Sequence, residues 1–315
     1  MSLPLRLFIA PLLLVTSLVI SVICHEQDFN QSSNEINQSP VNRLLILSLA
    51  DETSVDKLQR LNRSIEAFSL DVEYFHVNQS SEEPLRLHNF EALRTALELH
   101  RRDKDLVVLV SMSLNLIMNG DRGEVVNRFN KLTNDSAARL IFSADYYCFP
   151  KPELAEYYPK IEKVFGKRFL NSRAMIGFSS DIYQLFELVA SGAKARGATE
   201  IDLQAELTGI YLNETLRKNL GLGLDHRSEL FQSLDAKKPY ADDEVELEFE
   251  RNRTWVKNLA QNTRPLVIHA GGRARVSVWA ELTANKLAII DLLCQVGHRS
   301  RSKDVQLSRS LVTYT

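Results

Sequence analysis

The chain has 315 residues, of which 44% are hydrophobic and 25% are charged, and its formal net charge is −2. A chain of this length and composition can bury one full-sized core, so we expect a single globular domain. Charges of both signs are mixed along the sequence, which gives no electrostatic reason to expect a nucleic acid as partner.

An apolar segment lies close to the N-terminus. Residues 7–24 are apolar, follow Arg6 and end abruptly in a polar stretch. This pattern is typical of a cleaved signal peptide or a short membrane signal anchor, so we assign residues 1–24 to one of these. Residues 25–42 are rich in Gln, Asn, Ser and Glu without apolar periodicity, which predicts a flexible spacer.

Glycan acceptor sequences favour the same luminal location. Asn-X-Ser/Thr triplets begin at Asn30, Asn37, Asn62, Asn78, Asn134, Asn213 and Asn252. Of the 3 cysteines, Cys24 belongs to the predicted signal. Cys148 and Cys294 could therefore pair or stay free, and they are too few for a disulfide framework.

From residue 43 onward, short apolar runs alternate with segments of helical periodicity. The expected strands cover residues 43–49, 72–77, 106–111, 139–143, 174–178, 266–269 and, with one exposed face, 242–250. The expected helices cover residues 54–68, 90–100, 122–132, 182–190 and, at the C-terminus, 276–296. This order predicts an α/β fold with a doubly wound sheet.

Chemistry in such a sheet is expected beyond the carboxyl ends of the strands. A divalent cation would need carboxylates there, but Met112 and Asn115 follow the strongest predicted strand. His269 ends the last strand, and it is either a metal ligand or a buried core histidine. The glycines after it could form either a phosphate-binding turn or an ordinary turn. Asp202 lies near a predicted helix start, where capping alone would explain a carboxylate.

Four segments carry a resemblance to a known family. They are 142–150 (FSADYYCFP), 166–172 (GKRFLNS), 224–232 (LDHRSELFQ) and 265–269 (PLVIH). In this order they resemble the glycosyltransferase domain of the procollagen lysyl hydroxylases. The resemblance covers about residues 43–282. Residues 283–315 follow it as a C-terminal helix and basic tail. It implies a type-A glycosyltransferase-like (Rossmann-like) fold, a uridine diphosphate sugar as donor, a collagen-like polypeptide as acceptor and Mn²⁺ as cofactor.

The resemblance also implies that the metal site is degenerate. The two aspartates of the family's metal motif fall on Met112 and Asn115, whereas the family's histidine ligand is kept as His269. The family also has a run of aspartates, and Asp202 is an aspartate of that run that remains here. By this resemblance Asp202 is the candidate catalytic residue. We therefore expect Mn²⁺ to be a cofactor only if the chain is active.

Some positions that bind the sugar donor in the family are also changed in this chain. By resemblance, Leu49 and Asp51 match uridine contacts, and Gly272 and Arg275 match contacts to the diphosphate. A Gly-rich donor segment is replaced around residues 85–87, and Arg173-Ala174 stands where the family has Gly-Gly.

Three functional interpretations remain open from the sequence. In the first, the chain is a non-catalytic protein, in the lumen of the endoplasmic reticulum or secreted, that binds collagen or an active lysyl hydroxylase. In the second, it is an active glucosyltransferase or galactosyltransferase. In the third, it is a partial gene product. The family's second domain is an oxygenase that uses iron and 2-oxoglutarate, and the only histidine after His269 is His298. We therefore expect no Fe²⁺/2-oxoglutarate site and no lysine hydroxylation.

Overall fold

The computed structural model describes residues 19–22, 43–51, 55–77, 85–112, 114–161, 166–234, 245–250 and 253–270. Several predicted features lie outside these ranges: the spacer at 25–42, Gly272, Arg275, the C-terminal helix and Cys294.

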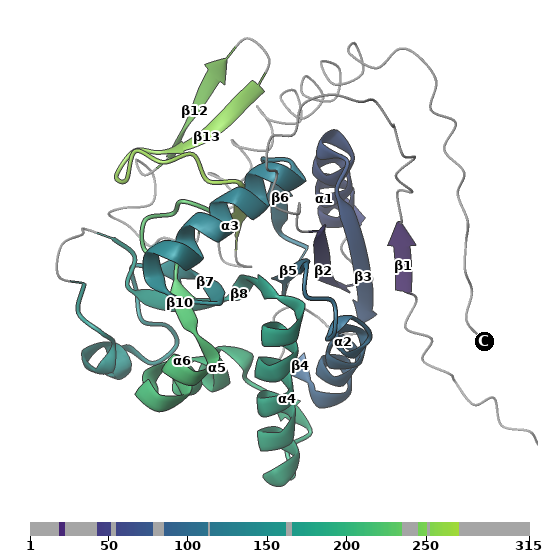
Figure 1. Ribbon diagram of the computed structural model, residues 1–315, viewed down its shortest axis with the longest axis vertical. Coiled ribbons are helices and arrows are strands. Elements are labelled where there is room, and N and C mark those ends of the chain that lie inside the picture. Colours follow the sequence, from purple (N-terminus) through teal and green to yellow (C-terminus); the bar gives the residue numbers. More distant parts are fainter. Residues whose placement is uncertain are drawn as a thin grey trace, which may run out of the picture.

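A 7-stranded mixed sheet forms the centre of the molecule, in the order β1-β3-β2-β5-β8-β7-β10 (Figure 1). Its strands are β1 (Val19–Val22), β2 (Arg43–Asp51), β3 (Asp71–Val77), β5 (Leu106–Ser111), β7 (Leu140–Asp145), β8 (Phe169–Phe178) and β10 (Leu222–Leu224). β2 is parallel to β3 and β5, and β7 is parallel to β10, whereas β8 runs antiparallel to both β5 and β7.

Helices cover both faces of this sheet, as a doubly wound fold requires (Figure 1). They are α1 (Val55–Phe68), α2 (Leu87–His100), α3 (Arg122–Ser136), α4 (Ser179–Ala195), α5 (Leu203–Leu212) and α6 (Glu214–Leu220). Side chains alternate across β2: Ile46 packs with α1 and α3, and its neighbour Leu47 packs with α2 and α4. β5 is wholly buried and contributes side chains to both apolar clusters. The sheet therefore lies between two apolar layers.

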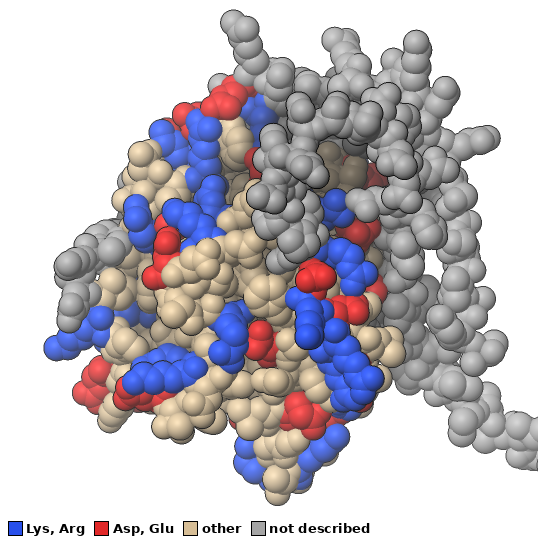
Figure 2. All heavy atoms as spheres, in the orientation of Figure 1, with Lys and Arg blue, Asp and Glu red and all other residues tan. Residues whose placement is uncertain are grey.

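Smaller elements extend this core. A 3-stranded sheet joins β11 (Phe231–Ser233), β14 (Val267–His269) and β6 (Leu116–Met118), and a hairpin pairs β12 (Val245–Glu250) with β13 (Arg253–Asn258). β4 (Leu85–Arg86) pairs with β9 (Glu200–Ile201), and η1 (Pro152–Tyr157) is a 3₁₀ helix. Basic and acidic side chains are interspersed over the face shown in Figure 2.

Most predicted elements appear where the apolar pattern placed them, but their ends differ. β8 begins at Phe169, five residues earlier than expected, because Asn171 and Ser172 form polar contacts that the hydrophobic pattern does not reveal. The apolar N-terminal segment also contributes β1, which pairs antiparallel with β3 at the edge of the sheet. No helix in the described part of the chain is long and apolar enough to cross a bilayer. The signal sequence and the domain limits stay predictions.

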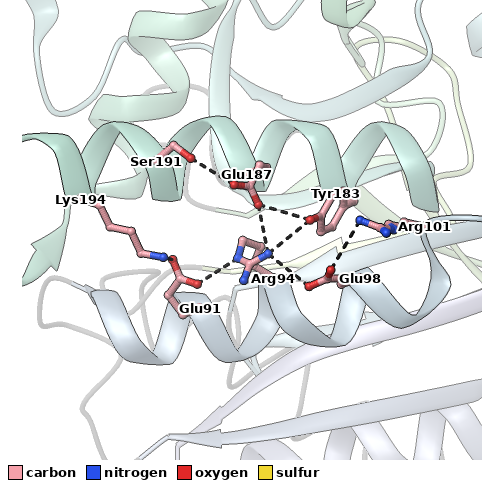
Figure 3. Close-up of polar contacts among 8 residues, drawn as sticks. All are labelled: Glu91, Arg94, Glu98, Arg101, Tyr183, Glu187, Ser191 and Lys194. Carbon is pink, nitrogen blue, oxygen red and sulfur yellow. Dashed lines mark hydrogen bonds and ion pairs between the residues drawn. The ribbon is translucent and has the colours of Figure 1, made fainter.

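A polar layer joins α2 to α4 above an aromatic contact between Phe90 and Phe186, whose ring centroids lie 4.7 Å apart. Arg94 is its centre (Figure 3): its guanidinium donates to Glu91 at 2.9 Å and to Glu187 at 3.0 Å. Lys194 forms an ion pair with Glu91 at 2.8 Å. Burial alone would raise the pKa of Glu91, but hydrogen bonds from Lys194 and Arg94 lower it. The two helices are thus fixed against each other by charge-assisted bonds.

Replacing this central arginine should destabilise the fold. We expect Arg94→Met to lower the free energy of unfolding by about 1.5–3 kcal/mol, because Glu91 and Glu187 lose a charged donor in a partly buried layer. Chemical denaturation measures the loss. Arg101→Met is the matched control. Arg101 contacts Glu98 at 3.5 Å on the exposed surface and lies 5.8 Å from the centre of the Tyr183 ring, so its replacement should cost less than about 1 kcal/mol. Equal losses in the two variants would contradict a central role for Arg94.

Candidate functional site

The carboxyl ends of β2, β5 and β7 meet at one edge of the central sheet, because these strands run the same way. The 3-stranded sheet approaches this edge: His269 in β14 pairs with Leu116 in β6, and the Ala270 amide donates to the Asn115 carbonyl at 3.1 Å. Two of the predicted metal positions, Asn115 and His269, are therefore brought to neighbouring segments.

His269 is a buried histidine with one nitrogen already engaged. Its side chain is 1% exposed, and Nε2 lies 2.7 Å from the Ser143 hydroxyl on β7. Nδ1 has no hydrogen-bond partner among the described residues. Burial first, and then the positive charges of Arg173 and Lys167, lower the pKa of His269 to about 3, so the ring is neutral at physiological pH. Nδ1 is itself buried.

The other two metal positions do not supply charged oxygen. Met112 packs its side chain against the apolar cluster of α2 and α4, and its amide donates to the Arg173 carbonyl at 2.9 Å. Asn115 is half-buried and offers a neutral amide. The described residues contain no group of three or more His, Cys, Asp or Glu side chains that could hold a metal. A thioether, an amide and a neutral imidazole beside two cationic side chains do not fit a hard divalent ion.

Asp202 is the N-cap of α5, where its carboxylate accepts a hydrogen bond from the Ala205 amide at 3.0 Å. Capping therefore accounts for its identity, and its catalytic role stays a prediction. Its neighbour Gln204 lies closer to the strand ends: the side chain accepts from the Ser172 amide at 2.9 Å and donates to the Leu170 carbonyl at 2.8 Å. Sequence reasoning did not single out Gln204.

The predicted uridine contacts lie at the end of β2. Leu49 is buried in the apolar cluster of α2 and α4, and Asp51 is the last residue of the strand, in register with Val77 of β3. Their roles in donor binding stay predictions, as do those of Gly272 and Arg275.

Buried polar contacts join three of the four motif segments at this edge. The Asp225 carboxylate is fully buried and accepts hydrogen bonds from the amides of Glu229, Leu230 and Phe231 at 2.7–2.9 Å. The Asp225 amide donates to the Phe142 carbonyl at 2.9 Å. Burial raises the pKa of Asp225, whereas the three amides and the Lys167 charge act in the opposite direction. One side chain thus fixes the backbone of residues 229–231 within this segment.

Lys167 connects the second motif segment to the third. Its amide donates to the His226 carbonyl at 2.9 Å, and its carbonyl lies 2.6 Å from the His226 ring nitrogen. The side chain is 2% exposed, and its ammonium lies 5.5 Å from the centre of the Tyr146 ring in the first motif segment. These contacts explain why the three segments share one region, and the sequence spacing alone could not show it.

The chain matches a known protein family over most of its length. The profile of the PLOD GT domain family matches residues 40–285. The chain belongs to this family. The predicted resemblance and the type-A glycosyltransferase-like α/β class are therefore confirmed.

This PLOD GT domain is similar in sequence to several curated proteins. The chain is 35% identical over 186 residues to human "Multifunctional procollagen lysine hydroxylase and glycosyltransferase LH3", a match that covers 59% of this chain and 23% of that protein. It is 30% identical over 244 residues to the Caenorhabditis elegans "Multifunctional procollagen lysine hydroxylase and glycosyltransferase", covering 74% of this chain and 31% of the relative. The chain thus spans less than a third of the length of these relatives.

A solved glycosyltransferase "involved in the glycosylation of the major capsid of PBCV-1" aligns with a TM-score of 0.45 at 11% identity. The alignment covers 77% of this chain and 99% of that one.

Removing the charge of Asp225 should destabilise the domain. We expect Asp225→Asn to lower the free energy of unfolding by at least about 2 kcal/mol, because an amide cannot accept from three backbone donors and places its own N–H against them. Denaturant unfolding checks this. Asp202→Asn is the control: asparagine caps helices as well as aspartate does, so its effect should stay within about 0.5 kcal/mol. An Asp225→Asn variant as stable as wild type would contradict the role assigned to this carboxylate.

Proposed function

We propose that this protein acts in collagen modification by binding, with weak or no sugar transfer. The observation that carries the proposal is the chemistry of the three metal positions: Met112 and Asn115 provide no carboxylate, and His269 is neutral and hydrogen-bonded to Ser143. A divalent ion stabilises the diphosphate leaving group in the transition state of such a transfer, so its loss costs several kcal/mol of catalysis.

Exposed aromatic side chains support polypeptide binding beside the same edge. Phe149 and Tyr157 are 65% and 64% exposed, and Tyr147 is 40% exposed, in the segment that follows β7 and runs through η1. Flat aromatic surfaces bind the extended, proline-rich chains of which collagen is built. The proposed ligand is a collagen-like polypeptide, bound alone or together with an active lysyl hydroxylase.

The proposed location is the lumen of the endoplasmic reticulum or the extracellular space. The relatives' names concern procollagen, which supports a secretory-pathway location. Two predicted glycan acceptors also support it: Asn134 in the last turn of α3 and Asn213 at the N-cap of α6 are both exposed.

A turnover assay tests the catalytic half of the proposal. The purified chain is mixed with uridine diphosphate glucose or galactose and a hydroxylysine-containing collagen peptide, with and without Mn²⁺, and released uridine diphosphate is measured. We expect no release above the protein-free background, while the nematode relative serves as the active reference. Peptide-dependent release that rises with Mn²⁺ would contradict the proposal and favour the alternative, an active sugar transferase.

Binding to a collagen-like peptide tests the other half. We expect the double variant Phe149→Ala/Tyr157→Ala to bind an immobilised peptide about tenfold more weakly than wild type, because exposed aromatic anchors dominate such contacts. Biolayer interferometry measures the change. Leu99→Ala removes an 80% exposed apolar side chain from α2 and should bind like wild type. Equal binding of all three proteins, or no binding by wild type, would argue against this surface.

A further inference from the structure

A bulge in β8 places Arg173 at the carboxyl edge of the central sheet. Phe142 of β7 pairs with Met175, but the next residue, Ser143, pairs with Asn171. Residues 172–174 therefore leave the ladder with β7. Bulges of this kind redirect side chains and are frequent beside active sites.

The main chain of this bulge is held by specific polar contacts. The Arg173 amide donates to the Asn171 side chain at 2.9 Å, and the Ser172 amide donates to the Gln204 side chain at 2.9 Å. The Arg173 carbonyl accepts from the Met112 amide, which follows β5. The backbone that carries this arginine is thus fixed on both sides, directly beside the first of the metal positions.

Two cationic side chains lie close to His269 at this edge. Arg173 is half-buried, Lys167 is buried, and both cations lie near enough to His269 to contribute to its lowered pKa. The adjacent carboxylates already have partners: Asp225 accepts three backbone amides, and Asp145 accepts from Asn171 at 2.8 Å. A divalent cation would be repelled here, whereas an anion would be attracted.

We propose that Arg173 takes the place of the divalent cation, so that this site binds the diphosphate group of a nucleoside diphosphate without a metal. A planar guanidinium forms two parallel hydrogen bonds to phosphate oxygens and carries a permanent positive charge. The inference rests on the proposed function in one respect only, namely that the metal site is lost. It does not depend on whether sugar is transferred or collagen is bound.

Calorimetric titration of uridine diphosphate into the full chain tests the inference, once with EDTA and once with Mn²⁺. We expect wild type to bind equally in both buffers, and Arg173→Ala to bind at least about tenfold more weakly in both. Arg173→Lys should fall between them, because it keeps the charge but loses the planar pair of donors. Arg102→Ala removes an exposed arginine at the opposite end of β5 and should bind like wild type.

A second variant makes the test reciprocal. Met112→Asp/Asn115→Asp/Arg173→Ala restores carboxylates and removes the cation, so its binding of uridine diphosphate should require Mn²⁺. Unfolding temperatures establish that each variant is folded. Wild-type binding that needs Mn²⁺, no wild-type binding in either buffer, or unchanged affinity in Arg173→Ala would each overturn the inference. Wild-type binding that needs Mn²⁺ would also contradict the loss of the metal site, on which the proposed function depends. The other two results would leave the turnover and collagen assays unaffected, so in those cases only the inference on Arg173 fails.

Discussion

The buried carboxylate of Asp225 is the interaction on which the arrangement of the candidate site depends. It lies in a fully buried position, and it satisfies three consecutive amides that would otherwise have no acceptor. The turn it stabilises leads directly into β11, which pairs with β14 and so positions His269. Because unsatisfied amides are costly away from water, this part of the fold tolerates little change.

The chain combines this preserved framework with changed chemistry at the strand ends. Asn171 and Gln204 hold β7, β8 and α5 together through side-chain hydrogen bonds, and Ser143 joins β7 to His269 of β14. The positions that would bind a metal instead carry a thioether and a neutral amide, and Arg173 occupies the adjacent bulge. Structure and catalysis make separate demands on a fold, so a scaffold can persist after its metal ligands are replaced.

Much of the fold could be predicted from the sequence, because hydrophobic periodicity reports burial directly. The β2 run alternates between two apolar clusters, and β5 is apolar throughout, which identifies a central strand. The short strands β6, β10 and β11 could not be predicted, since three residues show no reliable period. β14 is equally short but was predicted, because an apolar run after Pro265 marks it. The site could be predicted less well. The replacement of Gly-Gly by Arg173-Ala174 was visible in the sequence, but only the β8 bulge shows that this arginine lies beside Met112.

We propose that this chain keeps the family fold but no longer binds a divalent metal at the strand ends. Titration of Mn²⁺ into the metal-free chain, followed by the electron paramagnetic resonance signal of free Mn²⁺, tests it most directly. We expect the chain to leave the free signal unchanged at micromolar Mn²⁺, with or without uridine diphosphate. Stoichiometric loss of the free signal that disappears in a His269→Ala variant would contradict it.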